Sequence, residues 1–151
     1  MEGAESFPLA ARKAEKSSFR NCGLAGTPTI RFRFQSFERL TLDRDVERVF
    51  AEGERFSDGW LVIYAKARED KKPFRRLAIR VAKRVGNAPL RSRLRRLVRE
   101  VFRRDKENLR PSLDLVVIVQ PFAGAKKLKY GDLKKKWDEL TSQSRMRLSS
   151  L

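Results

Sequence analysis

The sequence contains no histidine and only one cysteine, Cys22, among its 151 residues. Without histidine, catalysis by a nucleophile that a histidine activates is excluded. Zinc sites built from cysteine and histidine are excluded too, and a lone cysteine cannot form a disulfide within the chain. These absences fit an intracellular, reducing compartment. We therefore expect a cytoplasmic protein in which Cys22 has no structural role.

Long apolar runs are also missing from the sequence. No segment is long and apolar enough to cross a membrane, and the first residues lack the continuous apolar core of a signal peptide. The sequence therefore predicts neither a transmembrane nor a secreted protein, and we expect no membrane partner.

Acidic residues are scarce relative to basic ones. The chain has 36 Lys and Arg against 19 Asp and Glu, which gives a formal net charge of +17. Residues 71–104 alone hold 14 basic residues and one acid, Glu100, so that +13 of this charge lies in less than a quarter of the chain. Such concentration indicates a surface that binds a polyanion, rather than charge spread for solubility.

The centre of this basic region is predicted to be one amphipathic helix. Gly86 ends the segment before it, Asn87 is suited to cap its first turn, and Pro89 tolerates an early helical position. Apolar residues at helical spacing form one stripe that should dock on the core: Leu90, Leu94, Leu97, Val98, Val101 and Phe102. The remaining surface is almost entirely arginine: Arg91, Arg93, Arg95, Arg96, Arg99, Arg103 and Arg104.

Arginines four residues apart on this helix repel one another, as in the series Arg91, Arg95 and Arg99. Each such pair costs about 0.2–0.5 kcal/mol. A polyanion would relieve this repulsion, and the planar guanidinium group fits phosphate oxygens better than an ammonium group does. The alternative is a solvated basic helix, which we disfavour because solvated faces usually carry both signs of charge.

The pattern along the chain predicts a single folded domain, residues 30–141, between two tails. We expect a disordered basic arm at residues 1–29 and a frayed tail at residues 142–151. Three interpretations of the arm stay open: a plain disordered terminus, an organelle transit peptide, or an arm that helps to hold RNA.

Within the domain, the periodicity predicts the element order (β)αββαβα. The expected elements are a short strand at 30–34, a helix at 43–52 capped by Asp43, a hairpin of strands 60–65 and 76–82, the arginine helix, a central strand at 113–119 and a last helix at 130–140. This order predicts an α+β fold, a mainly antiparallel sheet packed by helices. A βαβ crossover would contain the arginine helix, and such crossovers are right-handed by default.

The strand at 76–82 is expected to have two different faces. Leu77, Ile79 and Val81 should lie on one face, and Ala78, Arg80 and Ala82 on the other. The second face is small and cationic. It would either let a ligand lie close to the sheet or accommodate a helix.

Two segments carry a resemblance to a known family. Residues 83–88 (KRVGNA) and 91–100 (RSRLRRLVRE) resemble the signature of the bacterial ribonuclease P protein component: a basic pair, Gly-Asn-Ala, an Arg-Asn-Arg triplet, a second basic pair and a further arginine. Arg39-Leu40, followed by Val49-Phe50 and Gly53, is similar to the opening pattern of the family. The likeness extends over roughly residues 34–140.

The resemblance implies an α/β sandwich like the second domain of a protein of the small ribosomal subunit, with an unusual left-handed βαβ crossover. It also implies a protein subunit that binds ribonuclease P RNA and precursor tRNA, and we predict no protein partner. In this family the RNA removes the 5′ leader of precursor tRNA with Mg²⁺. The chain itself would then have no catalytic residue and no metal site, and Mg²⁺ would belong to the ribonucleoprotein.

The family pattern also assigns residues to two surfaces. Those expected to contact the RNA subunit are Lys83, Arg84, Asn87, Arg91, Ser92, Arg93, Arg95, Arg96 and Arg99. Those expected to line a cleft for the leader, between the first helix and the sheet, are Phe50, Tyr64, Ala78, Arg80 and Ala82. Phosphate contacts and stacking on aromatic rings are largely independent of base sequence, which suits a protein that accepts many leaders. Phe50 and Tyr64 could equally belong to the core.

Three features depart from the family pattern. Ser92 stands where the triplet usually has asparagine, and a hydroxyl offers fewer hydrogen bonds than an amide. Val46 stands where many members carry a cleft phenylalanine, so one stacking surface is lost. The arm before Ile30 is longer than the pattern requires.

Two other functions fit parts of the sequence. One is a ribosomal or other structural RNA- or DNA-binding module with no role in cleavage; a DNA groove reader is disfavoured because only Asn87 and Ser92 could supplement the arginines in reading bases. The other is a protein-only nuclease with carboxylate-bound metal, built from Asp43, Asp45, Glu47, Glu52 and Glu54. Metal-binding carboxylates must converge in a pocket, whereas these alternate with arginines as on a solvated helix.

Overall fold

The computed structural model of the chain describes residues 34–70, 72–144 and 146. The expected arm at 1–29 and most of the expected strand at 30–34 lie outside these residues, and Phe34 is not in a strand. The described elements follow one another as η1 (Ser36–Glu38), α2 (Asp43–Glu52), β1 (Glu54–Asp58), β2 (Leu61–Ala67), β3 (Arg76–Val81), η2 (Lys83–Val85), α3 (Ala88–Asp105), η3 (Lys106–Asn108), β4 (Leu113–Val119), η4 (Ala125–Lys127) and α4 (Tyr130–Gln143).

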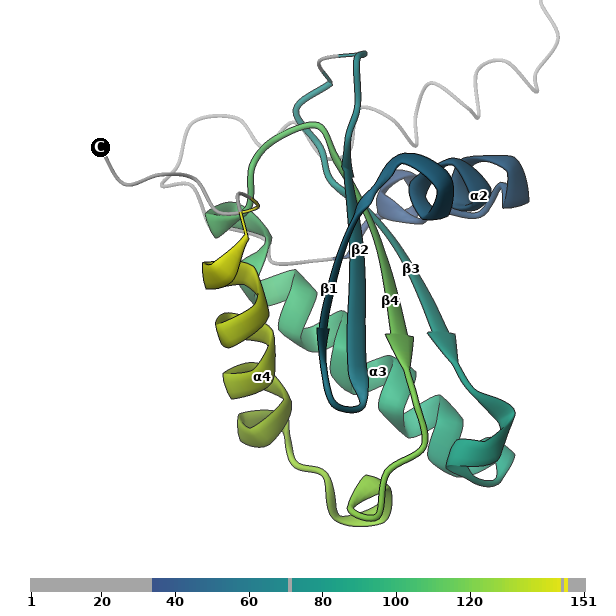
Figure 1. Cartoon of the computed structure of the whole chain (residues 1–151). Coiled ribbons are helices and arrows are strands. Elements are labelled where there is room, and N and C mark those ends of the chain that lie inside the picture. Colours follow the sequence, from purple (N-terminus) through teal and green to yellow (C-terminus); the bar gives the residue numbers. More distant parts are fainter. Residues whose placement is uncertain (1–33, 71, 145, 147–151) are drawn as a thin grey trace, which may run out of the picture. The chain divides into compact units, whose positions relative to one another are not determined.

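The four strands form one mixed sheet in the order β1-β2-β4-β3 (Figure 1). β1 pairs antiparallel with β2, β2 pairs antiparallel with β4, and β3 pairs parallel with β4. The prediction of a mainly antiparallel sheet with β4 at its centre is confirmed. The run LDLVVIV of β4 is apolar at almost every position because both faces of this strand are covered.

The predicted hairpin between residues 60–65 and 76–82 is wrong. β2 forms its hairpin with β1, through a turn in which Gly59 has φ +60°, and β4 lies between β2 and β3. β1 (ERFSD) contains a single apolar residue, Phe56, so its pattern did not predict a strand. An edge strand that is covered on one face only can form with a single apolar side chain directed at the core.

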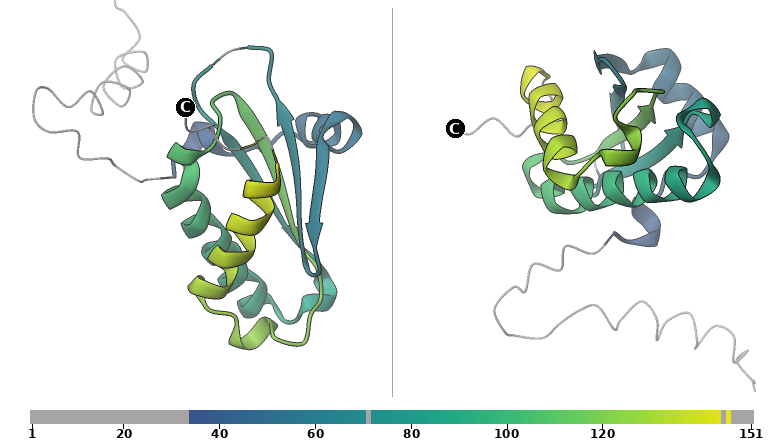
Figure 2. Two further views of the ribbon diagram at one scale, coloured as in Figure 1. Left: turned by 60° about the vertical axis from the view of Figure 1, so that its left-hand side comes forward. Right: turned by 90° about the horizontal axis from the view of Figure 1, so that it is seen from below.

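β3, α3 and β4 form the predicted βαβ crossover, and it is left-handed. In Figure 1, β3 and β4 both run downward, β4 lies to the left of β3, and α3 passes behind the sheet. The view from below in Figure 2 also places α3 on one side of the sheet and α2 on the other. The crossover thus has the left-handed form that the family resemblance implies, against the general preference for right-handed crossovers.

Helices cover the two faces of the sheet unequally. α3 and α4 pack on one face and bury the larger core, whose fully buried side chains include Leu61, Ile63, Phe102, Leu115 and Trp137. On the other face, α2 covers a small cluster of Leu40, Val46, Val49 and Val116. Part of that second face therefore stays open beside α2.

The ends of two helices differ in detail from the prediction. Asp43 is the first residue of α2, and the residue at the cap position is Leu42. The carboxylates of Asp43 and Asp45 lie in the first turn, where the positive end of the helix dipole stabilises them. α4 continues beyond Leu140 to Gln143, and Met146 is buried, with its carbonyl oxygen accepting a hydrogen bond from the N–H of Arg110 at 2.8 Å. Residues 142 and 143 of the predicted tail thus continue α4 and are exposed, whereas Met146 is buried.

A buried carboxylate joins α3 to α4. Asp105 is 1% exposed and accepts a hydrogen bond from the indole N–H of Trp137 at 2.7 Å. Lys134 lies 3.3 Å from the same carboxylate, and Asn108 donates to it at 2.9 Å. These bonds satisfy a charge that would otherwise be costly to bury.

Candidate nucleic-acid interface

The loop between β3 and α3 is shaped by its glycine and asparagine. Gly86 has φ +156°, and a Cβ atom there would lie 2.7 Å from Cδ2 of Leu90. The side chain of Asn87 accepts a hydrogen bond from the N–H of Leu90 at 3.2 Å, which confirms the predicted cap. Asn87 thus fixes where α3 begins, and Lys83 and Arg84 are exposed on η2 just before it.

The apolar stripe of α3 is buried as predicted. Leu90, Leu94, Val98, Val101 and Phe102 are buried, and Leu97 is half-buried. Opposite this stripe lies an outward ridge, which we define as Ser92, Arg96 and Arg99; all three are exposed. No hydrogen bond or ion pair involves these three side chains in the part of the chain that the structure describes.

Arg93 is exposed but turned toward the segment before α4. Its guanidinium group donates to the carbonyl oxygen of Lys126 at 2.7 Å and to that of Leu128 at 3.1 Å. A side chain expected to contact RNA is therefore engaged with the protein's own backbone, at the end of η4. Sequence periodicity places Arg93 on the solvent side of α3 but cannot show which loop lies beside it.

Glu100 of α3 binds two arginines of the same helix. It accepts hydrogen bonds from Arg103 at 2.9 and 2.6 Å and from Arg104 at 2.8 Å. The Arg103 bond lowers the pKa of Glu100 below its ordinary value, and Arg104 adds to the effect against the cost of burial. Arg104 also lies 5.0 Å from the ring centre of Tyr130. The C-terminal arginines of α3 are thus held near α4.

Arg91 and Arg95 lie on the flank of α3 opposite Arg93, and both are half-buried. The Nε atom of Arg91 is buried, with no hydrogen-bond partner among the described residues. Together with Arg99 they continue along one side of the helix at a spacing of four residues. The nine residues expected to bind the RNA subunit are thus spread over the η2 loop, the outward ridge and both flanks of α3.

The residues expected to line the leader cleft gather on the opposite face of the sheet, beside α2. The rings of Phe50 and Tyr64 meet edge to face, with centroids 4.9 Å apart. The guanidinium carbon of Arg80 lies 5.4 Å from the ring centroid of Phe50. Val116 of β4 is paired in register with Tyr64 of β2 on one side and with Ala78 of β3 on the other. The side chains of Tyr64 and Ala78 therefore lie on the same face of the sheet.

Arg80 and Ala82 extend this surface beyond α2. Arg80 is exposed, and its nearest carboxylate, that of Asp43, is 4.0 Å away. Ala82 follows β3 and is half-buried, and its N–H donates to the carbonyl oxygen of Val119 at 3.0 Å. An aromatic pair and a cation that lie next to small side chains can stack a base and neutralise a phosphate.

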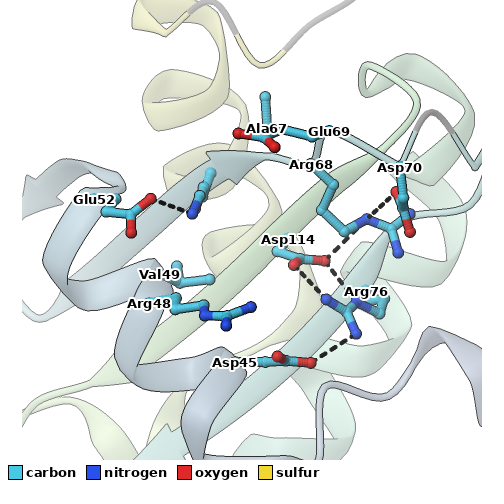
Figure 3. Close-up of a pocket in the computed structure, with 11 residues that line it drawn as sticks. Asp45, Arg48, Val49, Glu52, Ala67, Arg68, Glu69, Asp70, Arg76 and Asp114 are labelled. Atoms are coloured by element: carbon cyan, nitrogen blue, oxygen red, sulfur yellow. Dashed lines mark hydrogen bonds and ion pairs between the residues drawn. The ribbon is translucent and has the colours of Figure 1, made fainter.

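A charged pocket on the other flank of α2 was not predicted from the sequence (Figure 3). It has a volume of about 450 Å³, and at its floor Arg76 binds Asp114 of β4 and Asp45 of α2. The hydrogen bonds that Arg76 donates to the carboxylate of Asp114 are the largest cause of the raised pKa of Arg76. Asp114 is buried, and Arg68 lies 3.4 Å from it. In the sequence, the pocket is indicated only by Asp114, the single acidic residue within the apolar run of β4.

The described residues offer neither a cluster of metal ligands nor a membrane-spanning helix. No three acidic, cysteine or histidine side chains of residues 34–70, 72–144 and 146 come together as metal ligands. The acids near α2 instead pair with basic side chains, as Asp45 does with Arg76 and Glu52 with Lys66. In the same residues, no helix combines the length and apolarity needed to cross a bilayer.

The sequence of this chain is similar to those of known proteins. A family model described as Ribonuclease P matches residues 34–145. The chain is 36% identical over 104 residues to the ribonuclease P protein component of Dictyoglomus thermophilum, a match that covers 68% of this chain and 84% of that protein.

Solved structures show the same fold. The ribonuclease P protein of Thermotoga maritima superimposes with a TM-score of 0.62 at 29% identity, covering 72% of this chain and 98% of that one. The ribonuclease P protein of Staphylococcus aureus gives a TM-score of 0.64 at 24% identity, covering 74% and 98%. With a family model matched along the whole described domain, this chain belongs to the ribonuclease P protein component family.

Proposed function

We propose that this chain binds ribonuclease P RNA through α3 and the η2 loop, and holds the 5′ leader of precursor tRNA in the cleft beside α2. The RNA subunit would perform the cleavage with Mg²⁺, which the ribonucleoprotein binds. The family supports a subunit of ribonuclease P that acts in tRNA processing. The protein's own part is then to bind and orient two RNA molecules.

One observation carries this proposal: the two surfaces lie on opposite faces of one sheet. Figure 2 shows α3 and α2 on opposite faces of the sheet. The outward ridge belongs to α3, whereas Phe50 belongs to α2 and lies against Tyr64 and Arg80. Two RNA ligands could therefore be bound at the same time without competing. The exposed arginines of the ridge would supply phosphate contacts that do not depend on base sequence.

Reconstitution tests the proposal. The purified chain would be mixed with a bacterial ribonuclease P RNA and a precursor tRNA at a low Mg²⁺ concentration at which the RNA alone does not cleave. We expect the chain to restore removal of the leader and to be inert without the RNA. Binding to a matched RNA without any effect on cleavage would favour a structural RNA-binding module. Cleavage by the chain alone would instead indicate a protein-only nuclease.

A further inference from the structure

A small pocket lies between α3 and β3, one of the two edge strands of the described sheet, on the face opposite the proposed leader cleft. Its volume is about 200 Å³, and it is lined by Phe34, Arg39, Leu77, Ile79 and Arg99. On this open side of β3, the described backbone contacts are a bridge between Arg39 and Leu77 and a hydrogen bond from the N–H of Leu40 to the carbonyl oxygen of Leu77 at 3.0 Å. Arg39 is therefore anchored through its backbone at the rim of the pocket.

The pocket combines a fixed aromatic ring with two cations. The ring of Phe34 packs edge to face on Phe102 of the core, with centroids 5.8 Å apart and planes at 82°. The guanidinium carbon of Arg39 lies 5.9 Å from the same ring centroid. Arg39 and Arg99 are both exposed, and within the described residues neither is paired with a carboxylate.

We propose that this pocket binds one unpaired ribonucleotide, with its base against Phe34 and Ile79 and its phosphate between Arg39 and Arg99. This inference rests on the proposed function, from which it takes the RNA partner. The lining supplies what a nucleotide needs: an apolar wall, an aromatic ring and guanidinium groups, with no acid among the five residues. A paired base inside a duplex cannot present its face in this way.

The size and position of the pocket support a single nucleotide. The pocket is small, about 200 Å³, and one ring system suits this size better than a helix of a protein partner does. Arg99 also belongs to the series Arg91, Arg95 and Arg99 along one flank of α3, which Arg103, bound to Glu100, continues. An RNA strand that follows this flank would reach Arg39 next.

Removing the charge of Arg39 tests the phosphate contact. The affinity of Arg39→Ala for ribonuclease P RNA would be measured over a range of salt concentrations, beside the control Arg110→Ala, which removes an exposed arginine outside the pocket and outside α3. We expect Arg39→Ala to bind about tenfold more weakly and to lower the slope of log K against log salt by about 0.7–0.9. Behaviour equal to that of Arg110→Ala would overturn the inference.

Changing Phe34 tests the stacking contact separately. Phe34→Leu keeps an apolar side chain against Phe102 but removes the ring, so we expect weaker binding with an unchanged salt slope. Thermal unfolding followed by circular dichroism would show that each variant is folded. A Phe34→Leu variant that binds as the wild type does would contradict the assigned position of the base.

Crosslinking with 4-thiouridine identifies which RNA supplies the nucleotide. The wild-type chain would be irradiated with ribonuclease P RNA that carries the label and, in a separate arm, with a precursor tRNA labelled in its leader. A crosslink in the peptide that contains Phe34 and Arg39, in either arm, supports the pocket. If neither arm gives it while Arg96→Ala still weakens RNA binding, the pocket is wrong and the proposed function stands. If the wild-type chain binds neither RNA, the proposed function itself fails.

Discussion

Arg76 of β3 and Asp114 of the neighbouring strand β4 form a two-pronged ion pair, with Nε to Oδ1 at 2.8 Å and Nη2 to Oδ2 at 2.6 Å. The remaining arm of the guanidinium group reaches Asp45 of α2 at 3.0 Å. One side chain therefore fastens α2 to the sheet on the flank opposite Phe50. Since Phe50 belongs to the proposed leader cleft, this ion pair also fixes one wall of that cleft.

We expect Arg76→Ala to be strongly destabilising, because it leaves the buried carboxylate of Asp114 with Arg68 as its nearest described cation. Breaking a buried pair by removing one partner costs about 3–5 kcal/mol in the free energy of unfolding. Urea denaturation followed by circular dichroism would measure this loss. Lys66→Ala is the matched control, since its partner Glu52 is 60% exposed and such a pair contributes about 1 kcal/mol or less. Equal losses in the two variants would show that the Asp114 pair is not the stronger anchor.

Arg93 and Arg96 are three residues apart on α3, but we expect opposite effects from their removal. Arg93→Ala should lower the melting temperature, because the carbonyl groups of Lys126 and Leu128 lose their donor, and it should change the salt dependence of RNA binding little. Arg96→Ala should leave the melting temperature unchanged and flatten the salt slope by about 0.7–0.9. Differential scanning calorimetry and binding titrations at several salt concentrations would measure both. A flattened slope in Arg93→Ala alone would reverse the assignment.

Glu100→Gln should lower stability while it strengthens RNA binding. The variant loses the ion pairs with Arg103 and Arg104, a cost of about 0.5 kcal/mol, and it raises the positive charge of α3. The pKa of Glu100 is lowered in the folded chain, so its stabilising effect is fully present above the pKa of an unfolded glutamate, ~4.3, and is lost as pH falls through the lowered value. The difference in stability between wild type and variant should thus vanish in acid. A difference that stays constant down to low pH would contradict this explanation.

Tyr64→Ala should weaken binding of the leader but leave binding of the RNA subunit intact. Loss of stacking on one base costs about 1–3 kcal/mol, roughly 5- to 150-fold in affinity. The measurement compares the affinity of the reconstituted complex for precursor tRNA with its affinity for mature tRNA, which has no leader. Tyr64→Phe keeps the ring that meets Phe50 and should behave as the wild type does. An equal loss of precursor binding and of subunit assembly would contradict the cleft assignment.

Elements with dense local signals could be predicted from the sequence. β4 is continuously apolar, the bounds of α2 follow its helical spacing, and Asn87 caps α3 as its position suggests. β1 could not be predicted, because an edge strand with only Phe56 on its covered face has almost no pattern. The strand order was missed for a related reason: with β1 unrecognised, β3 was the nearest available partner for β2.

The candidate site shows the same division between local and long-range information. The amphipathic pattern gave the buried and outward sides of α3, and these are as predicted. It could not show that Arg93 binds the backbone near η4, or that Arg76 joins β3 to both β4 and α2, because these partners are far away in the sequence. The pocket beside Arg39 escaped prediction because it exists only where Phe34, β3 and α3 meet.

The place of β4 in the sheet also has a consequence for how the chain folds as it is synthesised. β1 and β2 can form their hairpin early, but β3 finds its strand partner among the described elements only in β4, which follows α3 in the sequence. Until β4 leaves the ribosome, the nascent arginine helix has no completed sheet on which to bury its apolar stripe. The apolar side of α3, the helix that carries the most positive charge, thus stays uncovered until β4 completes the sheet. The final third of the chain therefore determines when folding finishes.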